Sequence, residues 1–426
     1  MKLSRLFAIA CAAIACAVHA APAHLSGDEA RHLLIRTGFA PAPAEVAAIT
    51  GRSAEQAVDD MIAAAKGAQP LHPVPPEAIA PPPSLQQARA MTREERQEAA
   101  RDQIRKGMDI KDWWLREMIE TPTPLAERMT LFWHGHFATS QWKVKRADAM
   151  WRQHLLLRAN ALGSFRAMLH GIARDPAMLV YLDGDRNRKE APNENFAREV
   201  MELFTLGEAT QGGGYTEDDV REAARAFTGW TLERDELGAR FRPVLHDFGR
   251  KTLLGRSGDF DADQALDIML QQPEAARFIV GKLWREFVSP TPDPREVDRI
   301  AQRFRESDYD IAVAMHELLL SPAFWDPANF DSLVKSPVEL VVGSVREMGL
   351  RPQELRPMVQ KCKQLGQDLL MPPNVKGWAG YTDWINATTL LERRHFAGQL
   401  AAYVPADPQR MAAFRAAAMQ PEYQLK

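Results

Sequence analysis

The chain has 426 residues, of which 46% are hydrophobic and 26% are charged. This balance is typical of globular proteins and excludes a disordered or fibrous chain. The 53 Lys and Arg residues against 56 Asp and Glu residues give a formal net charge of −3, so the overall charge indicates neither nucleic acid nor an anionic membrane as a partner.

The first 20 residues have the pattern of a secretory signal peptide. Lys2 and Arg5 precede an apolar run over residues 6–18, and small residues up to Ala20 match the positions that a signal peptidase reads. We therefore expect cleavage after Ala20 and a periplasmic or secreted protein. A lipoprotein modified at Cys16 is the alternative, although the usual Leu at the third position before the cysteine is missing. No later segment reaches the roughly 20 apolar residues of a transmembrane helix.

Cleavage would leave Cys362 as the only cysteine, because Cys11 and Cys16 belong to the signal peptide. An exported protein without an internal disulfide depends on its hydrophobic core for stability. Cys362 lies in a stretch predicted to be helical. A structural cysteine is favoured there over a nucleophile, which needs a partner base and an accessible, electropositive setting.

The sequence then divides into three parts. An N-terminal helical segment is predicted over 21–69, where Ser26 and Ser53 each begin a capping box. A Pro-rich connector follows at 70–83, whose seven prolines exclude a helix. The main helical domain takes up 84–426.

The main domain is predicted to be a succession of helices. The predicted helices are one over 84–120, or two broken near Gly107; one from Thr123 toward His136; one from Thr216 to Gly229; three or four between 261 and 325; one from Ser336; and a last long one from Thr382. The alternating segments on either side of Asp247 favour one small hairpin in which 241–245 pairs with 251–254. The predicted fold is mostly α, a multi-helix globular body with at most one small β-hairpin near residues 240–255.

Eight short motifs follow one another in order along the chain: 113–115 (WWL), 125–137 (LAERMTLFWHGHF), 193–199 (NENFARE), 201–203 (MEL), 214–216 (GYT), 227–230 (FTGW), 246–247 (HD) and 372–378 (PPNVKGW). This series resembles the bacterial family called domain of unknown function 1800 (DUF1800). The resemblance implies an exported, helical protein. It also implies a possible partner, because such genes often lie beside one for an exported protein of the domain of unknown function 1501 (DUF1501) family, which resembles the alkaline phosphatase superfamily. It implies no catalytic residues.

His134 and His136 form the first candidate site. On a continuous helix the two side chains point about 200° apart, so they can bind one metal ion only if the helix ends at Gly135. A ligand or acid–base role therefore stands beside a structural one, in which one histidine is buried and hydrogen-bonded and the other is partly exposed.

A second candidate site resembles the calcium loop of an EF-hand. Asp183, Asp185 and Asn187 supply oxygen ligands at alternate positions, and Glu194 follows where the last ligand of such a loop stands. Arg188 occupies the position that requires Gly in that loop. A polar turn that precedes a helix is therefore the alternative interpretation.

The third candidate site is the acidic face of the helix that begins near Glu194. Glu199 and Glu202 lie one turn apart, as carboxylates of a metal site or an acid–base pair do. A solvated helix face is the alternative and the commoner cause of such spacing. His246 is a further candidate ligand, and with His134 or His136 and Glu199 it would suit zinc, iron or manganese.

Two functional hypotheses arise from these patterns. The first is a metal-dependent exported enzyme that acts on an envelope or extracellular substrate, with His134, His136, Glu199 and Glu202 as catalytic residues. The second is a non-catalytic helical adaptor or binding protein for another exported protein, such as the phosphatase-like neighbour. Convergence of the His and Glu candidates in space would favour the first.

Overall fold

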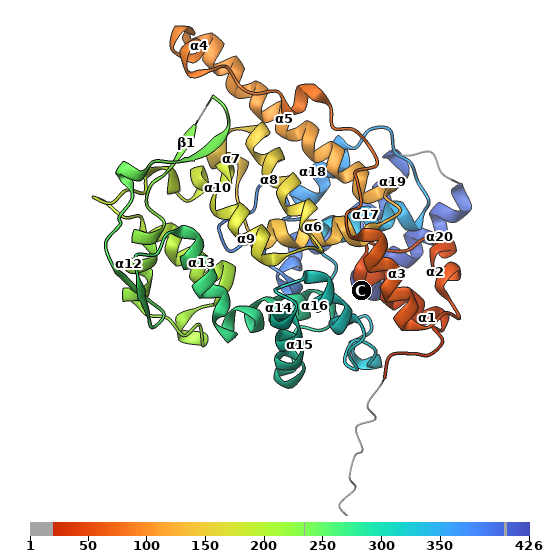
Figure 1. Cartoon of the computed structure of the whole chain (residues 1–426). Helices are drawn as coiled ribbons and strands as arrows, with labels where there is room; N and C mark the ends of the chain where they lie inside the picture. Colours follow the sequence, from red (N-terminus) through yellow and green to blue (C-terminus); the bar gives the residue numbers. More distant parts are fainter. Residues whose placement is uncertain (1–19, 234, 404–406) are drawn as a thin grey trace, which may run out of the picture.

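The computed structural model describes residues 20–233, 235–403 and 407–426, so the predicted signal peptide, except Ala20, lies outside the described residues. Over the described residues the fold is mostly α, as predicted, with twenty α-helices and two small antiparallel hairpins. Figure 1 shows the helices packed around one another.

Three helices form the N-terminal segment: α1 (Gly27–Thr37), α2 (Pro43–Ile49) and α3 (Ala54–Ala65). The Ser26 and Ser53 side chains cap α1 and α3, which confirms both predicted starts. The buried side chains of α1 and α3 belong to the same apolar core as those of later helices.

The Pro-rich connector lies against the long helix that comes after it. The backbone N–H groups of Leu71 and His72 each donate to the buried Glu117 carboxylate at 2.7 Å, and Trp113 Nε1 donates to the His72 carbonyl. These bonds satisfy a buried carboxylate with backbone donors. The connector is therefore held at its start, and it contains one 3-10 turn at Pro76–Ile79.

Residues 84–120 form two helices, α4 (Leu85–Ala90) and α5 (Arg93–Glu120). The break lies at Met91 and Thr92, not near Gly107, because Thr92 caps α5. Gly107 stays within the helix and makes room for the Gln141 side chain, which occupies the place of a β-carbon. In Figure 1, α4 and the first half of α5 extend from the top of the body.

The remaining helices complete the body. They are α6 (Pro124–His136), α7 (Gln141–Val144), α8 (Ala147–Ala159), α9 (Phe165–Ala173), α10 (Pro176–Tyr181), α11 (Glu194–Glu199), α12 (Glu217–Ala226), α13 (Ala262–Gln271), α14 (Pro273–Phe287), α15 (Pro294–Glu306), α16 (Ile311–Leu319), α17 (Pro337–Glu347), α18 (Arg356–Gln364), α19 (Ala387–Tyr403) and α20 (Pro408–Ala418). Helix α19 begins at Ala387 instead of Thr382, because residues Tyr381–Trp384 form a 3-10 turn and Asn386 caps the helix.

The predicted hairpin across Asp247 is wrong in its pairing. Strand β1 (Trp230–Glu233) pairs with β2 (Gly238–Phe241), and β3 (Lys251–Leu253) pairs with β4 (Arg256–Gly258). Leu254 and Gly255 both have positive φ, the backbone of a two-residue turn that returns the chain at once, so β3 pairs with the next segment of the chain. Residues 242–250 form the loop between the two hairpins.

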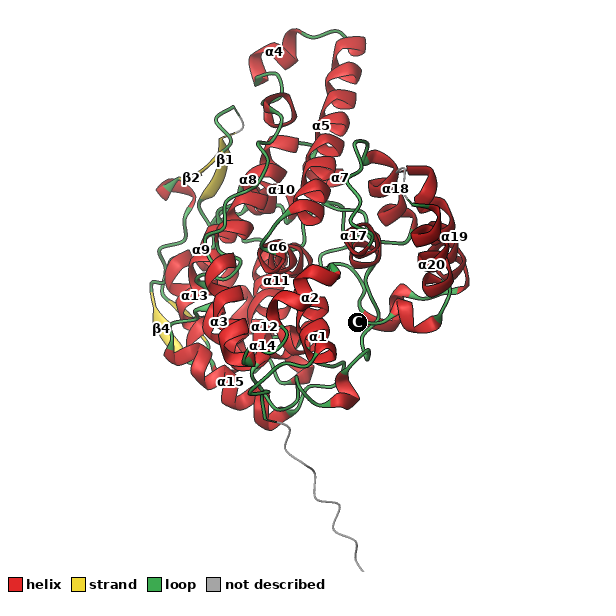
Figure 2. Ribbon diagram, turned by 90° about the vertical axis from the view of Figure 1, so that its right-hand side faces the viewer, coloured by secondary structure: helices red, strands yellow, loops and turns green. Residues whose placement is uncertain are grey.

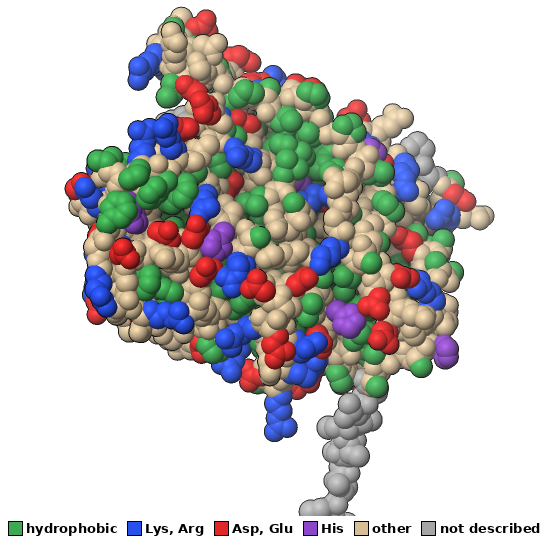
Figure 3. Space-filling model, in the orientation of Figure 1, with side chains coloured by type: hydrophobic (Ala, Val, Ile, Leu, Met, Phe, Trp, Pro, Cys, Tyr) green, Lys and Arg blue, Asp and Glu red, His purple; other side chains and the backbone are tan. Residues whose placement is uncertain are grey.

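Helix α6 lies between two apolar cores. Met129 and Trp133 belong to the larger core, with α1, α3, α9 and α12 to α16, whereas Leu131 belongs to the core of α5, α17, α18, α19 and α20. In Figure 2, α17 to α20 lie to the right of α6, whereas α9 and α12 to α15 lie to its left. No helix among the described residues is long and apolar enough to cross a membrane, and the face in Figure 3 carries both charge signs interspersed.

A candidate active-site cleft

A cleft of about 550 Å³ opens beside α6, where the two cores meet. Its walls come from the end of α6, the turn after α11, α14, residues 333–339 and the loop between α18 and α19. Clefts that combine apolar walls with a few convergent polar groups are the usual place of binding and catalysis. The polar and aromatic side chains that line it include His136, Glu202, Glu208, Phe278, Lys282, Arg285, Lys376 and Trp378.

Two glycines bring the loop between α18 and α19 onto α6. Gly377 has φ +88°, and a β-carbon there would lie 2.1 Å from the carbonyl oxygen of Gly135. A β-carbon on Gly135 would lie 3.7 Å from the Trp378 ring, which is an ordinary contact. Because Gly377 has no side chain, its loop can lie against Gly135, and Lys376 and Trp378 line the same cleft as His136.

A π-helix continues from α11 without a break, over Val200–Thr205. Leu206 N donates to the Met201 carbonyl at 2.7 Å, which is the five-residue spacing of a π-helix, and Thr205 Oγ1 donates to the Val200 carbonyl. Such widened turns are rare and occur often at functional sites. Here the π-helix carries Glu202 into the cleft and presents the Phe204 carbonyl to His136.

His136 and Lys282 form the polar centre of the cleft. His136 Nε2 lies 3.2 Å from the Phe204 carbonyl oxygen, which can only accept, so Nε2 carries the ring proton. Nδ1 is then free to accept a hydrogen bond from Lys282 Nζ at 2.9 Å. The Lys282 ammonium also lies 5.3 Å from the centre of the Phe278 ring. His136 is thus a neutral ring fixed between a carbonyl and an amine.

Burial shapes the protonation of this pair. Burial, and then the charge of Lys282, hold the pKa of His136 well below its usual value. Burial and the nearby Arg285 lower the pKa of Lys282 to about 8. The Lys282 amine therefore changes its charge close to neutral pH, as groups that transfer protons do.

Two glutamates and one lysine also line the cleft. Lys376 Nζ lies 3.3 Å from a Glu208 carboxylate oxygen and 3.9 Å from one of Glu202. Glu202 therefore brings a carboxylate to the cleft that contains Lys282. The two groups supply an acidic and a basic side chain to one space.

A cluster of paired charges lines another part of the cleft. Arg128 bonds to Glu286 and, at 2.6 Å, to Glu339, and Lys426 bonds to Glu339 as well. Burial alone would raise the pKa of Glu339, but Arg128 and Lys426 lower it to about 2. These charges neutralise one another, whereas Lys282 forms no ion pair among the described residues.

His134 does not face the cleft. Helix α6 continues through His136, so the two rings point to different sides of it. His134 Nε2 lies 3.2 Å from His154 Nδ1, and its ring packs against Trp114. Burial lowers the pKa of His134 to about 3, so it stays neutral inside the core.

Glu199 and Glu202 are neighbours, but only Glu202 lines the cleft. Glu199 is half-buried, and burial and the charge of Glu202 raise its pKa. Lys376 opposes that effect. The predicted pairing of the two carboxylates is present, with Glu199 at the margin.

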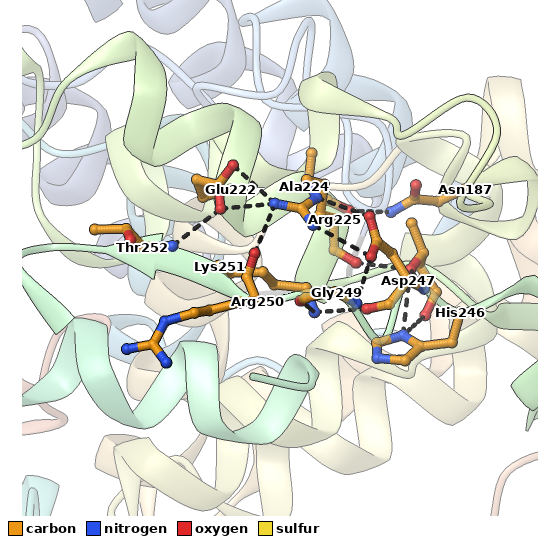
Figure 4. A network of polar contacts seen from close by, with 11 residues as sticks. Asn187, Glu222, Ala224, Arg225, His246, Asp247, Gly249, Arg250, Lys251 and Thr252 are labelled. Atoms are coloured by element: carbon orange, nitrogen blue, oxygen red, sulfur yellow. Dashed lines mark hydrogen bonds and ion pairs between the residues drawn. The ribbon is translucent and has the colours of Figure 1, made fainter. Parts of the chain in front are cut away.

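The calcium-loop candidates lie apart from the cleft, and their groups have other partners. The Asn187 amide donates to the Ala224 carbonyl and accepts from Asn193 N, as Figure 4 shows for the first bond. Asp183 pairs with Lys143 at 2.7 Å, and Glu194 lies 3.7 Å from Arg198. Asp185 is partly exposed in the 3-10 turn Gly184–Arg186.

His246 is also committed to its own loop. Its Nδ1 lies 2.9 Å from the Thr228 carbonyl oxygen, next to an Arg225–Asp247 ion pair that Figure 4 shows. It does not line the cleft. In the part of the chain that the structure describes, no three His, Cys, Asp or Glu side chains are arranged to hold one metal ion.

Sequence reasoning missed Lys282, the residue that pairs with His136. A signal was present, because Lys282 is a lone cation in an apolar stretch of helix between Phe278 and Trp284. Lys376 and Trp378 were included in a family motif but assigned no role. Cys362 is buried, which raises the pKa of its thiol and disfavours a nucleophilic thiolate.

One family model, described as "Protein of unknown function (DUF1800)", matches residues 32–424. That range includes every residue of the cleft except Lys426. No curated protein matches the chain. No solved structure matches it either.

Proposed function

We propose that this chain, which belongs to the DUF1800 family, is an exported enzyme that acts on an envelope or extracellular substrate in the cleft around His136 and Lys282. The export rests on the signal-peptide pattern of residues 1–20. The assignment as an enzyme rests on the side chains that meet in the cleft.

The observation that carries the proposal is the 2.9 Å hydrogen bond from Lys282 Nζ to His136 Nδ1. The bond uses one N–H of the Lys282 ammonium and leaves two for a ligand in the cleft. A lysine with a pKa of about 8 is mostly protonated at neutral pH and still gives up its proton readily. Lys282 is therefore the proton donor to a leaving group, and its charge stabilises negative charge that develops on the substrate.

His136 and Glu202 have distinct parts in this scheme. His136 holds the Lys282 amine in place, since its other nitrogen is fixed on the Phe204 carbonyl. Glu202 supplies a carboxylate in the same cleft, suited to accept a proton from an attacking water or hydroxyl. Lys282 as the acid and Glu202 as the base would divide the work as the acid and base of many hydrolytic sites do.

The metal-dependent form of the enzyme has less support than acid–base chemistry. Of the predicted ligands, His136 and Glu202 line the cleft, and both nitrogens of His136 are engaged in hydrogen bonds. A metal at His136 Nδ1 would have to displace Lys282. Zinc, iron or manganese would thus compete with the interaction that organises the cleft.

The test is turnover of envelope material by the purified protein and by Lys282→Met. Isolated cell-wall polymer, outer-membrane lipopolysaccharide and secreted polysaccharide are incubated with each, and released products are followed by mass spectrometry. We expect product with the wild type and none with Lys282→Met. Lys335→Met is the matched control, because Lys335 is also buried with a pKa of about 8 but lies outside the cleft lining. Equal product from Lys282→Met, or no product from the wild type on any polymer, contradicts the proposal.

One observation favours an adaptor function as the second candidate. Helix α4 and the first half of α5 extend from the body, and they expose Leu85 (45%) and Ile104 (69%). A projecting helical arm with apolar side chains suits a protein partner, for which the exported DUF1501-family protein is the candidate. Co-purification of the two proteins tests this function. We expect it to be lost with Ile104→Asp and kept with the control Leu391→Asp.

A further inference from the structure

Two loops outside the cleft lining form one surface, which we name the paired loops: residues 186–190 and 242–250. Lys189 N donates to the Leu245 carbonyl at 2.8 Å, which joins the loops directly. Gly229 N donates to the Asn187 carbonyl, and Arg242 N donates to the Gly229 carbonyl. The loops thus have a fixed position relative to each other, and the cleft function uses neither.

The paired loops are positively charged, although the whole chain has a net charge of −3. They contain five basic residues and two acidic ones, namely Arg186, Arg188, Lys189, Arg242 and Arg250 against Glu190 and Asp247. Arg225 holds Asp247 at 2.7 Å, as Figure 4 shows, so that carboxylate is already neutralised. Among the described residues, Arg188, Lys189 and Arg250 form no ion pair and are exposed.

Two apolar side chains project from the same surface. The exposed fraction is 71% for Val244 and 62% for Phe248. In Figure 3, hydrophobic side chains gather beside Lys and Arg side chains at the upper left, over the region of β1 and α12 in Figure 1. Exposed apolar side chains next to unpaired basic ones are the composition that interfacial membrane binding requires.

The apolar tips are held rigidly. Lys251 Nζ donates to the carbonyls of Asp247 and Gly249, at 2.5 and 3.0 Å, and fixes the backbone on both sides of Phe248. The Phe248 ring packs edge-on against His246, with centroids 4.6 Å apart. The exposure of Phe248 is therefore a fixed feature of the loop, so ordering it on a partner costs little conformational entropy.

We propose that the paired loops bind the surface of an anionic phospholipid membrane. Val244 and Phe248 enter the boundary between headgroups and acyl chains, while Arg188, Lys189, Arg242 and Arg250 contact lipid phosphates. A membrane is favoured over an acidic protein because the apolar side chains stand at loop tips and fill no groove. An anionic polymer would use the basic side chains but leaves Val244 without a function.

The test is co-sedimentation of the purified protein with vesicles. The vesicles contain either phosphatidylcholine alone or an equimolar mixture with phosphatidylglycerol. We expect binding to the anionic vesicles only, weakened by added salt because exposed charges are screened. The double variants Val244→Ser with Phe248→Ser, and Arg188→Glu with Lys189→Glu, should each lower the affinity about tenfold or more.

Two matched double variants serve as controls. Leu390→Ser with Leu391→Ser removes exposed apolar side chains from α19, and Arg295→Glu with Arg394→Glu reverses two exposed charges elsewhere. Both should bind as the wild type does, and all variants are first compared with it by thermal unfolding. Unchanged binding of either paired-loop variant, or equal binding to phosphatidylcholine alone, overturns the proposal. Retention on an anionic polymer column without vesicle binding assigns the surface to an acidic macromolecule and overturns it too.

Discussion

Gly135 and Gly377 lie backbone against backbone, 242 positions apart in the sequence, and this contact places the loop between α18 and α19 over His136. Gly377→Ala should lower the free energy of unfolding by about 3 kcal/mol, because an alanine there combines an unfavourable φ with a clash against a carbonyl. Denaturant unfolding gives the value.

Gly380→Ala is the control for that substitution. It lies in the same loop with no atom near the place of a β-carbon and with φ −121°. We expect its stability to stay within about 0.5 kcal/mol of the wild type. Equal stabilities of the two variants would mean that the glycine contact is not tight.

The buried Lys282 makes stability depend on pH. Its pKa is about 8 in the folded state and near the ordinary lysine value when unfolded, so the unfolded chain binds more protons between these values. This lysine therefore destabilises the fold below pH 8, by up to about 3 kcal/mol, and the effect vanishes as the pH rises through 10.5.

Lys282→Met removes the destabilisation caused by the buried ammonium. The free energy of unfolding of this variant should therefore exceed that of the wild type most at pH 7, and the difference should shrink toward pH 10.5. Urea unfolding at both pH values measures the difference. Lys335→Met should show the same trend, since the Lys335 pKa is also lowered to about 8 by burial. A difference that does not vary with pH would contradict the assigned charge state.

Turnover should also report on the Lys282 ammonium. As the proton donor it is active while protonated, so kcat should fall as the pH rises through about 8. Lys282→Met should lower kcat by about 100-fold or more. Lys335→Met should keep both the rate and the inflection, and a wild-type profile that rises through pH 8 would assign Lys282 as the base instead.

The cluster of Arg128, Glu286, Glu339 and Lys426 in the cleft lining should be important for stability. Glu339→Gln leaves Arg128 and Lys426 buried without their main counter-charge, which should cost about 3–5 kcal/mol at pH 7. Glu286→Gln, on a partly exposed side chain, should cost less.

The Glu339 effect has its own pH window. The pKa of Glu339 is about 2 when folded against 4.5 as its ordinary value, so its contribution is complete above pH 4.5 and is lost as the pH falls toward 2. The gap between the wild type and Glu339→Gln should therefore narrow over that range in acid-unfolding experiments. A constant gap would show that Glu339 is not held ionised by Arg128 and Lys426.

Local signals predicted most helices, because caps act within a few residues. Ser26, Ser53, Thr216 and Ser336 begin helices as their sequences indicated. The predicted pairing of the hairpin was wrong because Leu254 adopts a positive φ in a tight turn. Asn or Asp usually occupies that position, so the sequence did not indicate the turn.

The candidate site was only partly predictable. His136 and Glu202 were selected from their own segments, and both line the cleft. Lys282 was missed because its importance comes from His136, 146 positions earlier, and no local pattern encodes a contact of that range. His134 and His246 were selected as candidate ligands, but both are buried and hydrogen-bonded outside the cleft. A sequence does not show whether a histidine is buried in this way.

The prolines of 70–83 mark a change in composition, but they do not separate two parts of the protein that unfold independently. Glu117 is fully buried and accepts its two backbone bonds from Leu71 and His72, and the α1 and α3 side chains share a core with α6. A fragment that begins at residue 84 would lack the donors of this carboxylate and would expose half of an apolar interface. The helices before the connector and those after it should therefore unfold as one unit. A protease that cleaves proline-rich linkers should not cleave the connector in the native protein.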